Sequence, residues 1–203
     1  MELATPRGTA RVHLHRAPAP RGLMVLGHGA GGGIDAPDLV AVTETALGAG
    51  LSVALVEQPY RVAGRRAPDR APALDAAWTA IVAALRETLP TGTPVITGGR
   101  SSGARVACRT AADTGAAAVL CLAFPLRPPG RAGAAPKPSR LPELDAVSVP
   151  VLVVQGERDP FGMPPDGPGR IVARVPGDHS LRAGITGARE AVAEWLARVP
   201  PAR

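Results

Sequence analysis

A serine in a short glycine-flanked segment is the residue whose surroundings most clearly suggest chemistry. Residues 99–103 read Gly-Arg-Ser-Ser-Gly, between a short apolar run at residues 94–97 and an alanine-rich stretch with helical spacing. Such a segment forms a sharp strand-to-helix turn that presents the hydroxyl of Ser101 at the edge of a sheet, because its glycines let neighbouring backbone approach closely. The pattern predicts a nucleophile, although by itself it is weak evidence in a chain with 24 glycines.

A serine of this kind needs partners, because its hydroxyl is a weak nucleophile at neutral pH. A histidine must take its proton, and a carboxylate must hold that histidine in the right tautomer. The apolar run at residues 151–154 ends in a polar loop that carries Asp159, and the strand-like run at residues 171–175 is followed by His179. The chain therefore offers a nucleophile, an acid and a base in the order Ser101, Asp159, His179.

Other residues fit these roles less well. His13 and His15 alternate with apolar residues in a strand-like segment, which indicates solvent-facing positions. Glu157 is the competing acid, but it lies nearer the end of its strand than Asp159. The chosen residues also have a plainer interpretation, since an aspartate before proline is common turn chemistry and a loop histidine is often only solvated.

A glycine-rich loop follows the apolar run at residues 23–26. Residues 27–33 read Gly-His-Gly-Ala-Gly-Gly-Gly, and a loop of this composition can turn its amide groups inward. The loop lacks the ending of a P-loop, but it satisfies Gly-x-Gly-x-x-Gly after a strand, and Glu57 ends the next strand as a dinucleotide site requires. That alternative leaves the serine, the aspartate and the histidine unexplained.

Taken in order, several segments resemble the α/β-hydrolase superfamily over nearly the whole chain. The closest resemblance is to its small lidless branch, which includes dienelactone-hydrolase-like proteins and the hydrolase-like domain of subunit 3 of the chromatin NSL complex. The segments are residues 27–31, 98–103, 124–130, 155–162 and 177–180. The resemblance implies that Ser101 is the nucleophile, Asp159 the acid and His179 the general base.

The resemblance also implies how an oxyanion would be held. By this likeness, residues 27–33 form the oxyanion loop, with the N–H of Ala30 as one donor and the N–H of Ser102 as the other. Ser102 departs from the pattern, since many relatives have a larger residue such as methionine there. The frame of the turn favours Ser101 over Ser102 as the nucleophile.

The pattern of apolar runs predicts the fold class. With 45% hydrophobic but only 2% aromatic residues, the core must consist mainly of Ala, Val, Leu and Ile, which suits parallel strands covered by helices on both faces. Strand-like runs recur at residues 23–26, 53–56, 95–97, 118–123, 151–154 and 171–175. Helical stripes lie at Leu74, Trp78, Ile81, Val82, Leu85 and Leu89, and at Val192, Trp195, Leu196 and Val199. We expect one α/β-hydrolase domain over residues 1–203, with a mostly parallel, doubly wound sheet.

The connection between residues 124 and 149 is rich in Pro, Gly and Arg and shows no helical period. In larger α/β hydrolases a cap domain is commonly inserted at this connection. Because the segment is short, we expect only a loop here, and therefore an open site without a hydrophobic lid.

Arginine dominates the charge of the chain. The formal net charge is +6, and Lys137 is the single lysine, a skew that a GC-rich coding sequence produces. We predict no nucleic-acid binding, because neither a clustered basic helix nor interleaved aromatic residues is present. Several arginines follow predicted strands, namely Arg61, Arg65, Arg66, Arg127 and Arg158. Our hypothesis is that one or two of them pair with an anionic group of the substrate; the alternative is that they are solvated loop charges.

The remaining signals concern cysteines, metals and location. Cys108 and Cys121 fall in apolar segments, which indicates small buried residues rather than a required disulfide. Asp35 and Asp38 are interpreted as helix N-terminal residues around Pro37 rather than metal ligands, and we expect no metal and no cofactor. No signal peptide and no run of about 18 apolar residues is visible, so we predict a cytoplasmic protein without membrane contact.

Together these features predict a serine hydrolase. We expect it to cleave an ester or thioester of a small acyl substrate, with or without an anionic group, through an acyl-enzyme intermediate. The alternative is a catalytically silent module that keeps the hydrolase fold and serves in binding or as a scaffold.

Overall fold

The computed structural model describes residues 1–128 and 137–199 and places the strands of this part in one 8-stranded sheet. The strands are β1 (Glu2–Thr5), β2 (Gly8–His15), β3 (Leu23–Gly27), β4 (Ser52–Glu57), β5 (Val95–Arg100), β6 (Ala118–Leu122), β7 (Val151–Gly156) and β8 (Arg170–Val175). Their order in the sheet is β1-β2-β4-β3-β5-β6-β7-β8. Strands β3 to β8 are parallel, whereas β2 is antiparallel to both β1 and β4. The predicted mostly parallel sheet is confirmed.

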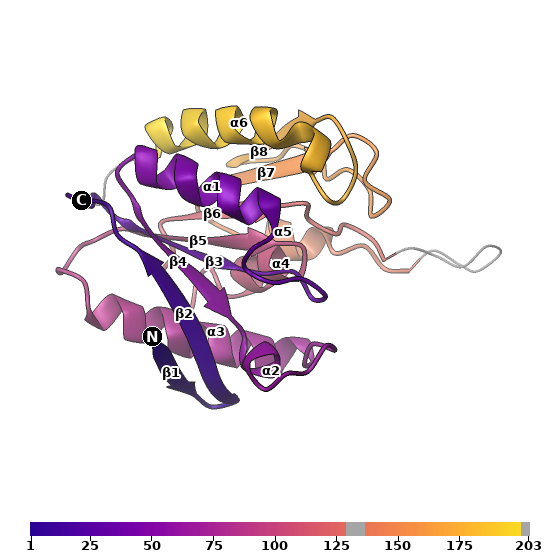
Figure 1. Cartoon of the computed structure of the whole chain (residues 1–203). Coiled ribbons are helices and arrows are strands. Elements are labelled where there is room, and N and C mark those ends of the chain that lie inside the picture. Colours follow the sequence, from indigo (N-terminus) through magenta and orange to yellow (C-terminus); the bar gives the residue numbers. More distant parts are fainter. Residues whose placement is uncertain (129–136, 200–203) are drawn as a thin grey trace.

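Helices cover both faces of this sheet (Figure 1). They are α1 (Pro37–Gly48), α2 (Pro59–Val62), α3 (Ala71–Glu87), α4 (Ser102–Arg109), α5 (Leu141–Asp145) and α6 (Ile185–Arg198), with a 3-10 turn at Arg182–Gly184 before α6. Helices α1 and α6 pack against each other on one face, where they bury one apolar cluster with the strands. Helices α3 and α4 lie against the other face. Apolar side chains therefore fill a layer on each side of the strands, as expected for a doubly wound sheet.

The apolar runs recognised in the sequence lie in strands β3 to β8, except that Ala123 follows the end of β6. The two helical stripes lie in α3 and α6, except for Leu89 and Val199, which follow the ends of these helices. Both tryptophans belong to the core, with exposed fractions of 0% for Trp78 and 5% for Trp195. Leu89 lies beyond the end of α3, where it packs against the same apolar cluster. Cys108 and Cys121 are buried as predicted; their Sγ atoms lie 3.4 Å apart, and both are free thiols.

The expectation of an uninterrupted loop between residues 124 and 149 is wrong. Helix α5 begins at Leu141, and Pro142 stands in its first turn, where proline is well tolerated because the missing N–H has no helical partner there. Buried Leu144 joins the apolar cluster that includes α4. A helix of five residues is too short to show a period in the sequence. Residues 129–136 of this connection, which include part of the segment 124–130 quoted for the resemblance, lie outside the described residues.

The turn between β5 and α4 depends on close backbone contacts that leave no space for a Cβ atom at two glycines. A Cβ atom on Gly99 would lie 2.4 Å from the carbonyl oxygen of Gly27, and one on Gly103 would lie 2.3 Å from the same oxygen. Between these glycines, Ser101 has the backbone angles φ 52 and ψ −106, which a residue with a side chain rarely adopts. The glycines of the Gly-x-Ser-x-Gly segment are therefore required by the close approach of β3.

We expect Gly103→Ala to lower the free energy of unfolding by about 1–3 kcal/mol or more, because the added methyl group must push β3 and α4 apart. Urea denaturation measures the effect. Gly48→Ala is the matched control, since a Cβ atom there would meet nothing within 4 Å, and alanine favours a helix by roughly 0.5–1 kcal/mol. Equal stability of the two variants would contradict the close contact.

Candidate active site

The structure brings the predicted serine, aspartate and histidine together in one hydrogen-bonded chain. The hydroxyl of Ser101 lies 3.0 Å from Nε2 of His179, and Nδ1 of His179 lies 2.8 Å from Oδ2 of Asp159. Because a carboxylate can only accept, Nδ1 carries the proton and donates to Asp159, which leaves Nε2 free to accept from the serine hydroxyl. This arrangement can move a proton from Ser101 to the imidazole ring.

The carboxylate of Asp159 is held by several donors at once. Its side chain is 0% exposed, its Oδ1 accepts from the N–H of Phe161 at 2.8 Å, and its Oδ2 accepts both from His179 and from Nε2 of Gln155 at 2.8 Å. These bonds compensate for the burial of the carboxylate and fix the oxygen that faces the imidazole.

Gln155 was missed in the sequence as part of this site. The side chain is fully buried, and its Nε2 also lies 3.1 Å from the carbonyl oxygen of Phe124 and 2.9 Å from that of Gly162. All of these partners are acceptors, so the amide has one possible orientation. The signal was present in the sequence, because Gln155 is the one polar side chain in the otherwise apolar strand β7.

The imidazole of His179 is partly covered. Its side chain is 19% exposed, and the ring of Phe161 lies against it with centroids 4.4 Å apart and an interplanar angle of 41°. The ring limits the movement of the imidazole on one side. The serine and the histidine are half-buried, so part of each residue is exposed to solvent.

The glycine-rich loop after β3 is fixed by His28. This side chain is 3% exposed, its Nδ1 donates to the carbonyl of Gly29 at 2.8 Å, and its Nε2 accepts from the N–H of Gln58 at 3.2 Å. Burial, the largest effect, lowers the pKa of His28, so the ring stays neutral. The carbonyl of Gly29 and the N–H of Ala30 point in opposite directions within one trans peptide, so His28 fixes the direction of that N–H.

The same loop lies beside Ser101. A Cβ atom on Gly29 would lie 3.6 Å from Cβ of Ser101, and the hydroxyl of Tyr60 donates to the carbonyl of Ala30 at 3.0 Å. The N–H of Ser102 belongs to the first residue of α4, where helical N–H groups lack intrahelical partners. The loop residue before Ala30 and the first residue of α4 therefore both lie next to Ser101.

The dinucleotide interpretation of this loop finds little support in the geometry. Its pattern requires the loop to open a helix directly, but α1 begins only at Pro37. Glu57, the acid at the end of β4, is paired with Nε2 of His13 at 2.7 Å. The side chain of His13 is nevertheless 41% exposed and His15 is exposed, so both lie at solvent-facing positions as predicted.

The arginines of the hypothesis follow β4, β6 and β7, at the edge of the sheet where Ser101 lies. Arg65 forms a bidentate pair with Asp69 at 2.7 and 2.9 Å. Arg66, Arg127 and Arg158 are exposed. Arg61 is half-buried in α2, and its charge adds a small lowering to the pKa of His28, for which burial is the main cause. Within residues 1–128 and 137–199, Arg61 forms no ion pair.

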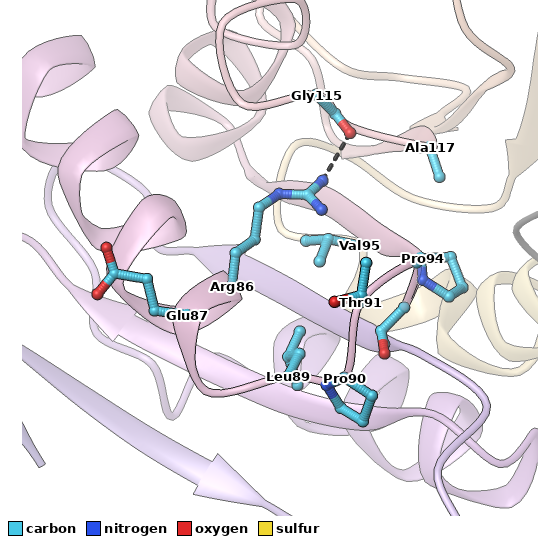
Figure 2. Close-up of a pocket in the computed structure, with 11 residues that line it drawn as sticks. Arg86, Glu87, Leu89, Pro90, Thr91, Pro94, Val95, Gly115 and Ala117 are labelled. Carbon is cyan, nitrogen blue, oxygen red and sulfur yellow. Dashed lines mark hydrogen bonds between the residues drawn. The ribbon is translucent and has the colours of Figure 1, made fainter.

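A cavity of about 540 Å³ lies away from this site (Figure 2). It is lined by Arg86 and Val95, the latter at the start of β5, whereas Ser101 follows the opposite end of that strand. The guanidinium of Arg86 donates to the carbonyls of Thr114 at 3.0 Å and Gly115 at 2.6 Å, so its donors hold the backbone together. The cavity does not contribute to the candidate active site.

Among the described residues, no group of three or more His, Cys, Asp or Glu side chains could hold a metal ion. In the same part of the chain, none of the helices has the length and apolar character needed to span a bilayer.

The chain belongs to the α/β-hydrolase family. The family described as alpha/beta hydrolase domain matches residues 20–167, which is most of the chain. A search of curated protein sequences finds no significant match.

Solved structures show the same fold. An α/β serine hydrolase without a lid from Xanthomonas campestris is 18% identical, with a TM-score of 0.77 and coverage of 100% of this chain and 95% of that chain. Est1E from Butyrivibrio proteoclasticus, with ferulic acid bound, is 17% identical, with a TM-score of 0.78 and 98% coverage of both chains. A dienelactone hydrolase from Anabaena variabilis is 17% identical, with a TM-score of 0.75 and coverage of 100% and 97%. The predicted resemblance to lidless hydrolases is confirmed at the level of the fold.

The burial of His28 predicts a pH dependence of stability. In the unfolded chain this imidazole binds a proton near the ordinary pKa of 6.5, whereas burial lowers its pKa in the folded protein. Between these values the unfolded chain binds more protons, so the stability that His28 contributes is present above about pH 6.5 and is lost as the pH falls toward the folded pKa, by up to about 1.4 kcal/mol per pH unit.

Urea denaturation from about pH 8 to about pH 5 measures this slope. His28→Gln removes the titrating group and should flatten the dependence relative to the natural protein. His15→Gln, which removes an exposed histidine, should leave the dependence unchanged. The same slope with and without the His28 imidazole would contradict a neutral buried ring.

Proposed function

We propose that this protein is a serine hydrolase that cleaves an ester or thioester of a small acyl substrate through an acyl-enzyme intermediate. The observation that carries the proposal is the hydrogen-bonded chain from Ser101 through His179 to Asp159, with distances of 3.0 and 2.8 Å. Membership of the α/β-hydrolase family is consistent with it.

In the acylation step, Nε2 of His179 takes the hydroxyl proton while Oγ of Ser101 attacks the carbonyl carbon of the substrate. The imidazolium ion is stabilised by the carboxylate of Asp159, which stays ionised. Nε2–H then donates its proton to the departing alkoxide or thiolate, and the acyl group remains bonded to Oγ. In deacylation the same nitrogen takes a proton from water, whose oxygen attacks the acyl carbonyl. The bond between the acyl carbon and Oγ then breaks, Nε2–H returns its proton to Oγ of Ser101, and the carboxylic acid leaves.

The oxyanion of each tetrahedral intermediate is assigned to the N–H groups of Ala30 and Ser102. The support for this assignment is the peptide between Gly29 and Ala30, whose orientation the buried His28 fixes before substrate arrives. Donors held in advance cost no reorganisation during the reaction, and loss of one such donor typically slows a hydrolase by about a hundredfold or more.

The proposed substrate is small or partly exposed while bound. The described residues contain no inserted cap, and the serine and histidine are only half-buried. The structural neighbours include a protein with bound ferulic acid and a dienelactone hydrolase. Both names are consistent with hydrolysis of a small acyl compound by this chain.

Labelling with a fluorophosphonate probe tests the proposal. We expect the natural protein to be labelled and to hydrolyse short acyl esters, and Ser101→Ala to lose the label and at least about ten thousandfold of the activity. Ser102→Ala is the matched control and should keep the label, since the N–H of residue 102 is retained. An unlabelled natural protein would favour a silent binding or scaffold module, and labelling lost only in Ser102→Ala would identify the other serine as nucleophile.

We propose in addition that Arg61 pairs with an anionic group on the substrate. It follows Tyr60, whose hydroxyl donates to the carbonyl of Ala30 in the glycine-rich loop, and its charge acts on His28 of the same loop. Among the described residues Arg61 has no ion-pair partner. A guanidinium binds a carboxylate or phosphate through two parallel hydrogen bonds.

Matched esters with and without a carboxylate on the acyl group test this pairing. We expect Arg61→Gln to raise KM for the anionic ester by about tenfold and to leave the neutral ester unchanged, because only the anion loses a charged partner. Arg65→Gln is the control, since that guanidinium is already bound to Asp69. Equal effects of Arg61→Gln on both esters would exclude charge recognition by this residue.

A further inference from the structure

The residue before the nucleophile, Arg100, makes contacts that the proposed reaction does not use. It ends β5, and its side chain is only 19% exposed. Its Nε donates to Oδ2 of Asp38 at 2.8 Å, and its Nη2 donates to the backbone carbonyl of His179 at 3.0 Å. One guanidinium therefore joins the strand that carries Ser101 to the main chain of the histidine.

Asp38 keeps this guanidinium in place. The carboxylate is 1% exposed in the first turn of α1, where its Oδ1 also accepts from the N–H of Leu39 at 3.0 Å. Burial, the largest effect, raises the pKa of Asp38, and the charge of Arg100 opposes that rise. Asp38 was predicted to be a helix N-terminal residue, which it is, but its buried pairing with Arg100 was not predicted.

Other contacts also hold the loop that carries His179, but they involve the two residues before it, Gly177 and Asp178. The N–H of Arg158 donates to the carbonyl of Gly177 at 2.9 Å. A Cβ atom on Gly156 would lie 2.4 Å from the carbonyl oxygen of Asp178, so the loop rests directly on the end of β7. In contrast, Arg100 binds the backbone of His179 itself, and it stands at the end of β5 directly before Ser101.

We propose that Arg100 is a positioning residue for His179. Its guanidinium, held by the carboxylate of Asp38, fixes the backbone of His179 relative to Ser101. This keeps Nε2 of His179 within hydrogen-bonding distance of Oγ of Ser101. The proposal rests on the proposed hydrolase function and adds to it a residue outside the chain of Ser101, His179 and Asp159. Arginine suits this role because its planar fork serves both acceptors with separate nitrogens, which the single ammonium of lysine cannot do.

The double variant Asp38→Leu/Arg100→Met tests the proposal, because removing both charges leaves no unpaired buried ion and such replacements often keep the fold. We expect its melting temperature to stay close to that of the natural protein. For a short aryl ester we expect kcat to fall by roughly ten- to a hundredfold and KM to change little, since displacement of a catalytic group by about 1 Å costs up to about a hundredfold. An unchanged kcat would overturn the proposal.

A second ion pair supplies the matched control. Arg105 in α4 binds Glu143 in α5, with Nε 2.9 Å from Oε2, and neither side chain is hydrogen-bonded to Ser101, His179 or Asp159. The backbone N–H of Arg105 donates to the carbonyl of Ser101 at 3.2 Å, and the substitution retains this bond. Arg105→Met/Glu143→Leu should keep kcat. Arg100→Lys retains the charge beside Asp38 but not the second donor, so we expect it to fold and to lose kcat as the double variant does. Restoration of full kcat by lysine would also overturn the proposal.

A measurement without turnover separates this proposal from the proposed function. In protein labelled with ¹⁵N-histidine, the proton between Nδ1 of His179 and Asp159 gives a downfield signal that survives only while exchange with water is slow. We expect the signal in the natural protein and in the Arg105→Met/Glu143→Leu control, and its broadening in Asp38→Leu/Arg100→Met. This result would support the positioning role even if no ester were hydrolysed. A sharp signal in all three proteins would overturn it.

Discussion

The contact between the end of β3 and the turn after β5 is the constraint on which the rest of the site depends. The carbonyl of Gly27 lies so close to Gly99 and Gly103 that no Cβ atom fits at either position. This approach places the glycine-rich loop beside Ser101 and forces the serine into its unusual backbone conformation. A backbone conformation of this kind is retained only where the surrounding structure over-determines it. The N–H of Ser101 donates to the carbonyl of Leu122 in β6 at 2.9 Å, so the turn is also held by the neighbouring strand on its other side.

The parallel sheet explains how residues far apart in the chain reach this turn. Strands β5, β6, β7 and β8 are neighbours and run in the same direction, so the loops after β5, β7 and β8 all open at one edge. Asp159 follows β7 and His179 follows β8, which brings the imidazole back over the turn that carries Ser101. The common direction of the strands brings Ser101, Asp159 and His179 to the same edge of the sheet. Side-chain hydrogen bonds, such as those of Gln155, supply their orientation.

The sequence was sufficient to predict strands β3 to β8 and the order of serine, aspartate and histidine, because each of these features has a local signal, whereas β1 was not predicted. Short continuous apolar runs indicate these strands, and glycines mark the turn. The supporting residues have no such local signal. Arg100 and Asp38 are 62 positions apart, and the carbonyl that Arg100 binds is 79 positions away. An aspartate near the start of a helix already has an ordinary explanation, so only the three-dimensional arrangement reveals its buried partner.

The structure also shows which of the positive charges are paired within the protein, which the net charge alone does not reveal. Many of the arginines are paired within the protein, since Arg65, Arg100, Arg105, Arg109 and Arg170 each bind a carboxylate. Most of these ion pairs join two different helices or strands and therefore hold the fold together. The formal charge of +6 is therefore a poor guide to what the protein binds. Under the proposed function, the charges available to a ligand are those at this edge of the sheet that no carboxylate already binds, and this criterion distinguishes Arg61 from Arg100 among the described residues.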